Sequence, residues 1–277
     1  MKTLSVTTKH IQTPSNNFLR YTFPSNVNLS NHQIGLASLS LFYSFYNISS
    51  KKNNNKFQYI WDGTTYDVEL PNLTGEVSDI NNYLQFIFRS RNHYMINASG
   101  DPVYFVEMVV DKARYAIAII TTQVPNAFNS TYPQASNSHF TLPSNAFMPV
   151  IKMVDTSKFN ELIGFTNTFQ TSATLATNHT ALSSSAPVLN PDSNIIVVIQ
   201  NMIDNQYSSP NGVIHSFGIS ANIGEQILEK PSEISYNDIM PSHYDHLDIR
   251  ILNADTLEDV EILDPEISIL LLIREKS

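Results

Sequence analysis

Short apolar runs of strand length recur along this chain, with apolar residues alternating with small or polar ones over 34–48, and helical spacing is confined to two short stretches. Because successive side chains of a strand point to opposite faces of a sheet, a repeat of two residues predicts β-strands. An early apolar run closes at 21–23, and Pro24 follows it. Further strands are predicted at 34–48, at 57–61 and 66–70 as a hairpin with a Gly-bearing turn, at 103–110 and 115–122 as a second hairpin, and at 148–154, 194–203, 213–219, 247–252 and 266–274.

Two helices are predicted against this background. The first lies near 78–92, where Ser78 is a candidate N-cap and Arg89 and Arg91 suit the negative end of the helix dipole. Its apolar residues recur at helical spacing: Ile80, Tyr83, Leu84, Ile87 and Phe88. The second is short and lies near 157–164, with Phe159, Leu162 and Ile163 on one face and Gly164 placed to end it.

About a dozen strands, two short helices and no repeating βαβ rhythm predict an all-β fold, most simply a jelly-roll β-sandwich. We expect a single jelly roll formed by 1–65 and 166–277. Residues 66–165 are expected to form an inserted or stacked upper β-rich part that carries both helices. The stretches 126–146 and 167–192 show little periodicity and are expected to be long surface loops.

The charge of the chain is unevenly distributed. Residues 1–224 carry 12 acidic and 12 basic side chains, whereas residues 225–277 carry 13 and 4, so the whole net charge of -9 lies in the last 53 residues. A dense acidic segment contributes Asp255, Glu258, Asp259, Glu261, Asp264 and Glu266. It is a solvated strand face and turn, a cation site, or a docking face for a basic partner. The sequence pI of about 5.3 argues against a nucleic-acid partner.

No motif with catalytic or cofactor-binding chemistry stands out. The chain has no Cys and only 8 Gly, which removes thiolate sites and leaves little material for a phosphate-binding loop. The best metal candidate is the group His243, Asp245, His246 and Asp248, but a regular strand would send its two His–Asp pairs to opposite faces. We therefore predict no catalytic, cofactor or metal site, and no enzyme activity.

Two further candidate features point to carbohydrate chemistry. The carboxylate pairs Glu258/Asp259 and Asp264/Glu266 resemble the acid–base pairs of glycoside hydrolases, although neighbouring acids in a turn are usually only solvated. Trp61 is the only Trp, and a packed hairpin aromatic is a better interpretation of it than a sugar platform. Six glycosylation sequons are about the number that chance gives, and we expect them to be unmodified: Asn28, Asn47, Asn72, Asn97, Asn129 and Asn178.

The longest apolar run near the C-terminus is 269–273, too short to span a membrane. The first ten residues lack the apolar core of a signal peptide, so we expect synthesis without one.

Several blocks in succession resemble the minor capsid (penton) proteins of Polinton/Maverick elements and virophages, part of the adenovirus-like jelly-roll capsid lineage. The blocks are residues 34–48 with 55–59, residues 70–84 including Gly75 and Asn81-Asn82-Tyr83-Leu84, residues 162–165, residues 194–198 through Tyr207-Ser208-Ser209-Pro210 to 217, and a closing hairpin from 247–252 to 269–275. They appear in the expected order and span nearly the whole chain. The last turn, Asn253-Ala254-Asp255-Thr256, lacks the Gly usual in the family.

This resemblance implies a structural capsid protein of the virion, most simply the subunit that closes the five-fold vertices as a homo-pentamer. Its partners would be copies of itself and the major capsid protein of the same particle, with no catalytic residues. The alternative is a receptor- or glycan-binding spike or lectin-like jelly roll, which would add a host receptor. A β-rich hydrolase is the third hypothesis. An isolated protein that binds a glycan would favour the second, and one that binds itself and a capsid partner would favour the first.

Overall fold

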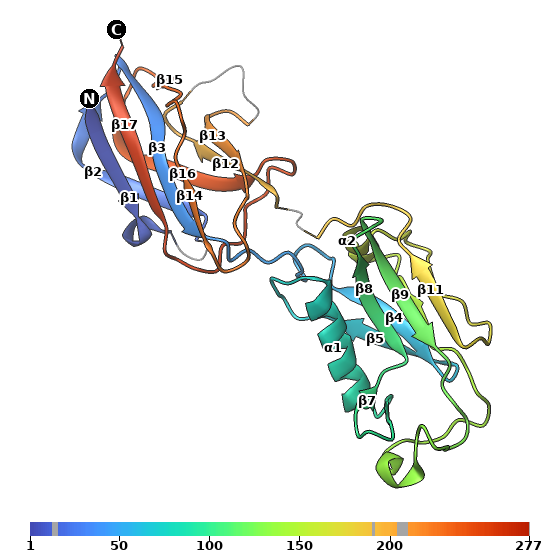
Figure 1. Cartoon of the computed structure of the whole chain (residues 1–277). Coiled ribbons are helices and arrows are strands. Elements are labelled where there is room, and N and C mark those ends of the chain that lie inside the picture. Colours follow the sequence, from blue (N-terminus) through green and yellow to red (C-terminus); the bar gives the residue numbers. More distant parts are fainter. Residues whose placement is uncertain (13–15, 190–191, 204–209, 277) are drawn as a thin grey trace. The chain divides into compact units, whose positions relative to one another are not determined.

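The computed structural model describes residues 1–12, 16–189, 192–203 and 210–276 (Figure 1). The chain divides into two compact units. The first consists of Met1–Tyr46 and Asp192–Ser277, and the second of Asn47–Pro191. The second unit is therefore wider than the 66–165 expected from the sequence. It includes the hairpin at 56–69, because this hairpin pairs with a strand at 150–152 and contributes Phe57, Tyr59 and Trp61 to the core of that unit.

The first unit contains two antiparallel sheets. One has the order β1 (Lys2–Thr7), β17 (Ser268–Glu275), β3 (His32–Phe42) and β14 (Gln226–Glu229), with β15 (Asn237–Asp238) also paired to β3. The other has the order β13 (Val213–Gly218), β12 (Asn194–Ile199), β16 (His243–Asn253) and β2 (Phe18–Asn28). When the eight main strands are numbered along the chain, the orders are 1-8-3-6 and 5-4-7-2. This is the strand order of a jelly roll, and it confirms the predicted fold class.

A bulge in β3 sets which side chains enter the core. The pairing of β3 with β17 shifts register between Leu270 and Leu271, which leaves Ala37 without a partner opposite it. Ile34 and Leu36 face the core before the bulge, and Leu39 and Leu41 face it afterwards. Because an extra residue reverses the alternation of a strand, the bulge keeps both halves of β3 apolar on the inner side.

Strand β2 continues through Pro24, where the sequence predicted an interruption. β2 lies at the edge of its sheet, and its pairing with β16 is irregular between Tyr244 and His246, opposite the segment that holds Pro24. A Pro removes one ladder donor, which is tolerated at an edge or a bulge.

The prediction that the chain closes with a hairpin is wrong. β16 and β17 belong to different sheets, and the 254–267 segment crosses from one sheet to the other. Isolated bridges fasten this segment to Leu252 and to Phe45. Part of the fourth resemblance block, Tyr207, Ser208 and Ser209, lies outside the described residues.

The second unit is built from two three-stranded antiparallel sheets. One has the order β10 (Val150–Lys152), β4 (Lys56–Trp61) and β5 (Thr64–Glu69), and the other β11 (Asn178–Leu182), β9 (Ala116–Thr122) and β8 (Val106–Asp111). A small pair, β6 (Met95–Ile96) and β7 (Pro102–Val103), and the 3-10 helix η2 (Gln134–Asn137) complete it. The first unit also contains a 3-10 helix, η1 (Thr8–His10). Both predicted hairpins, β4–β5 and β8–β9, are present, and Asp62 and Gly63 take the positive φ that a two-residue hairpin turn requires.

Two α-helices pack on these sheets, as predicted. α1 (Val77–Ser90) begins one residue before Ser78, and Ser78 does not cap it; instead the Asp79 carboxylate accepts a hydrogen bond from the Glu76 N–H at 2.8 Å. α2 (Phe159–Ile163) ends at Gly164, which has a φ of 78°. A Cβ at this position would lie 2.3 Å from the carbonyl oxygen of Ser185, so both the conformation and the space require Gly.

Candidate binding sites and interaction surfaces

Three of the four side chains of the metal candidate His243, Asp245, His246 and Asp248 contact one another in a polar network. The bulge at Tyr244–His246 brings His246 against both acids, with Nδ1 2.5 Å from Oδ1 of Asp245 and Nε2 3.5 Å from Oδ2 of Asp248. Regular alternation predicted His246 and Asp248 on one face and Asp245 on the other, and the bulge allows His246 to contact Asp245 as well. His243 is exposed at the start of the strand.

Arg20 from the neighbouring strand β2 forms an ion pair with the Asp248 carboxylate, which a metal ion at this site would need as a ligand. Its Nε and Nη2 each donate to Asp248 at 2.7 Å, a two-pronged geometry that engages both carboxylate oxygens. The same contact raises the pKa of Arg20, and the hydrogen bond to His246 lowers the pKa of Asp245. Within the described ranges, no three His, Asp or Glu side chains converge as metal ligands.

The acidic segment at 254–267 is anchored by apolar residues and keeps part of its charge at the surface. Val260 and Ile262 are buried in the core of the first unit, and the Asn16 amide donates to the Ile262 carbonyl at 2.9 Å. Asp259 pairs with Arg250. Its exposed acids are Asp255, Glu258 and Glu266. The segment therefore presents three carboxylates to solvent from a fixed backbone.

Trp61 belongs to a buried aromatic cluster and cannot serve as a sugar platform. Its ring stacks on His93 with centroids 4.4 Å apart, and only 7% of the residue is exposed. The Tyr59 hydroxyl lies 2.9 Å from Nδ1 of His93 and accepts a hydrogen bond from Arg91 at 3.0 Å. Because the Tyr59 hydroxyl accepts from Arg91, its own hydrogen is free to be donated to Nδ1 of His93. We therefore assign neutral His93 the tautomer that carries its proton on Nε2. Burial, followed by the charge of Arg91, lowers the pKa of His93 to about 4.

One hollow of the second unit, of about 520 Å³, lies beside α2, and the loop around it uses much of its polar lining. The Asn53 amide donates to the carbonyl of Thr156, and the Asn160 amide donates to that of Phe165. The hydroxyl of Ser157 donates to the Asn53 carbonyl. These groups stabilise the loop, so they are not available to a ligand.

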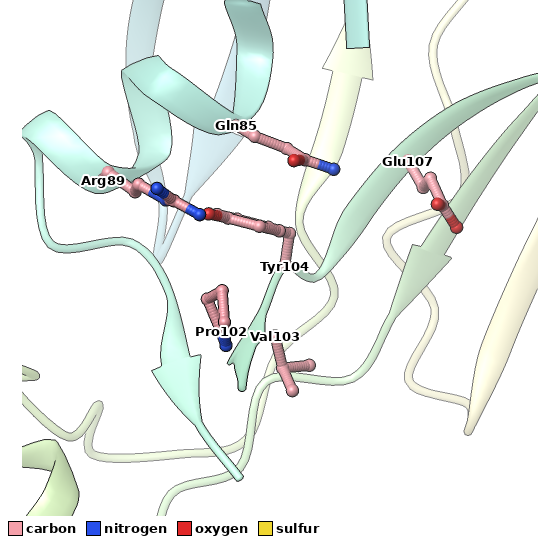
Figure 2. A pocket seen from close by; sticks show the side chains of 6 residues that line it. All are labelled: Gln85, Arg89, Pro102, Val103, Tyr104 and Glu107. Atoms are coloured by element: carbon pink, nitrogen blue, oxygen red, sulfur yellow. The ribbon is translucent and has the colours of Figure 1, made fainter. Parts of the chain in front are cut away.

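A second hollow, of about 460 Å³, lies between α1 and the segment 102–107 (Figure 2). Its lining residues are Gln85, Arg89, Pro102, Val103, Tyr104 and Glu107. Arg89 lies over the Tyr104 ring, 5.5 Å from its centroid, and its Nε donates to the Tyr104 hydroxyl. Sequence reasoning missed this site. Gln85 and Arg89 are one turn apart on α1, which is visible in the sequence, but no pattern places Tyr104 and Glu107 beside them.

The sequon residues are largely engaged in local structure. Asn47 is buried, and its amide donates to the carbonyls of Gly75 and Leu189. Asn97 and Asn129 accept backbone N–H groups two residues further along, within their own turns. In the part of the chain that the structure describes, no helix is both long and apolar enough to cross a membrane.

Comparison with known proteins finds similar chains among the solved structures. No protein-family model and no curated protein matches the chain. The crystal structure of SeMet-labeled mavirus penton protein is similar to this chain over 99% of both chains, with a TM-score of 0.46 and 13% sequence identity.

Proposed function

We propose that this chain is a structural capsid protein, and specifically the subunit that closes the five-fold vertices of an icosahedral particle. The observation that carries the proposal is the strand order of the first unit: two four-stranded sheets in the order of a jelly roll, interrupted between β3 and β12 by a second unit. Jelly rolls are common in viral capsids, and the sequence blocks that resemble penton proteins include five of the eight main strands. Fold alone does not determine function, so the assignment needs the experiment described below.

The distribution of charge supports docking of the first unit, rather than the second, on a basic partner. The first unit has 15 acidic and 7 basic residues, a net charge of -8, whereas the second has 10 and 9, a net charge of -1. A surface of one sign attracts a partner of the other sign and speeds its association. We infer that the jelly-roll unit contacts a basic surface of the major capsid protein, through the exposed acids of the 254–267 segment.

This docking inference is tested by removing charge from one unit at a time. The double variant Asp255→Asn/Glu258→Gln is expected to weaken binding to the major capsid protein, and added salt is expected to weaken the wild-type complex. The matched control Asp62→Asn/Asp101→Asn removes the same charge from the exposed surface of the second unit and is expected to have little effect. Equal effects of the two double variants would contradict a docking surface on the jelly roll.

The pentamer is tested by counting subunits. A ring needs two different complementary patches on each subunit, and the angle between them sets the number of copies. Imaging of assembled particles is expected to show five copies at each vertex, and native mass spectrometry of the purified protein gives the mass of any free ring. A trimer or hexamer at non-vertex positions would eliminate the vertex assignment.

A receptor- or glycan-binding module is the second candidate function. The observation in its favour is the hollow beside α1, in which the Gln85 amide and the Glu107 carboxylate make no hydrogen bond or ion pair with the described residues. The two functions are separable, because a capsid subunit binds itself and a capsid partner, whereas a binding module has saturable affinity for a host-surface molecule.

A further inference from the structure

The hollow between α1 and the segment 102–107 differs from the hollow beside α2 because some of its polar groups have no partner among the described residues. Among the described residues, neither the Gln85 amide nor the Glu107 carboxylate makes a hydrogen bond or ion pair, and the terminal nitrogens of Arg89 make none. Figure 2 shows the Gln85 amide directed into the space between α1 and Glu107. The volume of about 460 Å³ falls within the range of small-molecule sites.

The Arg89 side chain is held in place before any ligand arrives. Its Nε donates to the Tyr104 hydroxyl, and its guanidinium lies over the Tyr104 ring. Tyr104 is itself supported, because its ring packs against Tyr94 at 6.1 Å and Tyr94 stacks on His139 at 4.4 Å. A cation that is already ordered loses little side-chain entropy on binding, which favours affinity.

The arrangement of donors and acceptors restricts the chemical class of ligand that the hollow can bind. Arg89 offers only donors, Glu107 offers only acceptors, and Gln85 offers both. An anion suited to Arg89 would be repelled by Glu107, and a cation suited to Glu107 would be repelled by Arg89. A neutral ligand with several hydroxyl groups avoids both conflicts, because each hydroxyl can donate and accept. Pro102, Val103 and the Tyr104 ring supply apolar surface for the C–H groups of such a ligand.

We propose that this hollow binds one pyranose unit of a neutral saccharide, with hydroxyls that accept from Arg89 and Gln85 and donate to Glu107. This inference deepens the second candidate function, because both rest on the hollow beside α1, and the residues that line it all belong to the second unit. A single sugar unit has about a dozen non-hydrogen atoms, so a Kd on the order of millimolar is expected.

The test uses the full-length protein and four neutral sugars: glucose, galactose, mannose and N-acetylglucosamine. Saturation-transfer NMR and titration are expected to give saturable binding of at least one of them. Glu107→Gln and Gln85→Ala are each expected to weaken binding about tenfold, the usual loss for a hydrogen bond to a charged or well-placed polar group. Tyr104→Phe keeps the ring but removes the hydroxyl that orients Arg89, and a smaller loss of affinity is expected.

The matched control is Glu161→Gln, which makes the same substitution in the hollow beside α2 and is expected to leave the Kd unchanged. Unchanged thermal unfolding of each variant establishes that the protein is folded. Glycine, titrated in parallel, is a zwitterion that could bridge Arg89 and Glu107. Saturable binding of glycine in place of sugar would overturn the proposal, as would the absence of binding to all four sugars or a Kd unaffected by Glu107→Gln.

Discussion

At the scale of single residues, His93 makes the stability of the second unit dependent on pH. Its pKa is about 4 in the folded protein and 6.5 in an unfolded chain, so the unfolded state binds more protons between these values. The stabilisation is present above pH 6.5 and is lost as the pH falls toward 4. The shift corresponds to roughly 3 kcal/mol as an upper bound, because solvent near the cluster reduces the effect.

Urea unfolding at pH 7.5 and pH 4 measures the free energy of unfolding of the wild-type protein and of the His93→Gln variant, and the wild type is expected to lose more stability at pH 4. The Gln side chain keeps an acceptor for the Tyr59 hydroxyl but does not titrate. Other acidic groups titrate in both proteins, so the difference between the two profiles isolates His93. Parallel pH profiles would show that His93 does not cause the loss.

Gly164 is predicted to be the least replaceable glycine of the second unit. Gly164→Ala places a methyl group 2.3 Å from the Ser185 carbonyl oxygen in a left-handed conformation, and a loss of more than about 2 kcal/mol is expected. Gly100→Ala is the control, since Gly100 has a φ of 90° but open space around it, and about 1 kcal/mol is expected. Chemical denaturation measures both values, and equal losses would show that the contact with Ser185 is unimportant.

At the scale of elements, α1 closes the outer edge of β8 through one side chain. The side-chain amide oxygen Oδ1 of Asn81 accepts the Met108 N–H at 2.9 Å, in a buried position on the side of β8 away from β9. Asn81→Ala leaves that N–H unpaired, and a loss of about 1–3 kcal/mol is expected. Asn82→Ala, at the next and exposed position of α1, is expected to change stability by less than about 0.5 kcal/mol. Hydrogen exchange at Met108 would rise in the first variant only.

Strands with one strongly apolar face were predictable, and weakly apolar edge strands were not. β3, β12, β16 and β17 each bury several aliphatic side chains, and their apolar content is visible in the sequence, as a continuous run in β12. β1, β11 and β14 lie at the ends of their sheets and were missed. β1 buries only Leu4 and Val6, and an edge strand needs no more, so local composition does not distinguish it from a loop.

The candidate sites could not be predicted from the sequence for a different reason. The contact of His246 with Asp245 lies at a bulge, which the local pattern does not reveal. The hollow beside α1 depends on a tertiary contact that brings the segment after Gly100 against Arg89. Residue types suggested the chemistry in the first case, but only the fold supplies the geometry in either.

At the scale of the whole molecule, the two units are expected to fold independently, because each buries its own apolar cluster. Residues 47–191 expressed alone are expected to give a dispersed amide NMR spectrum and a cooperative unfolding transition. The complementary chain, with 47–191 replaced by a short Gly/Ser linker, is expected to keep a β-sheet circular dichroism spectrum. A molten spectrum from the isolated 47–191 segment would contradict independent folding.

The pairing of the jelly-roll strands has a consequence for synthesis. Among the described strands, β1 pairs with β17, β2 with β16, and β3 with β14, β15 and β17, so each N-terminal strand pairs only with strands that follow Asp192. The last strand, β17, lies between β1 and β3. The ribosome therefore releases almost the entire chain before the first sheet can close, and the inserted unit, which is continuous in sequence, emerges in time to fold first. Its fold brings Asn47 against Leu189, whose carbonyl accepts a hydrogen bond from the Asn47 amide at 2.8 Å, and this reduces the entropy cost of joining the two halves of the jelly roll.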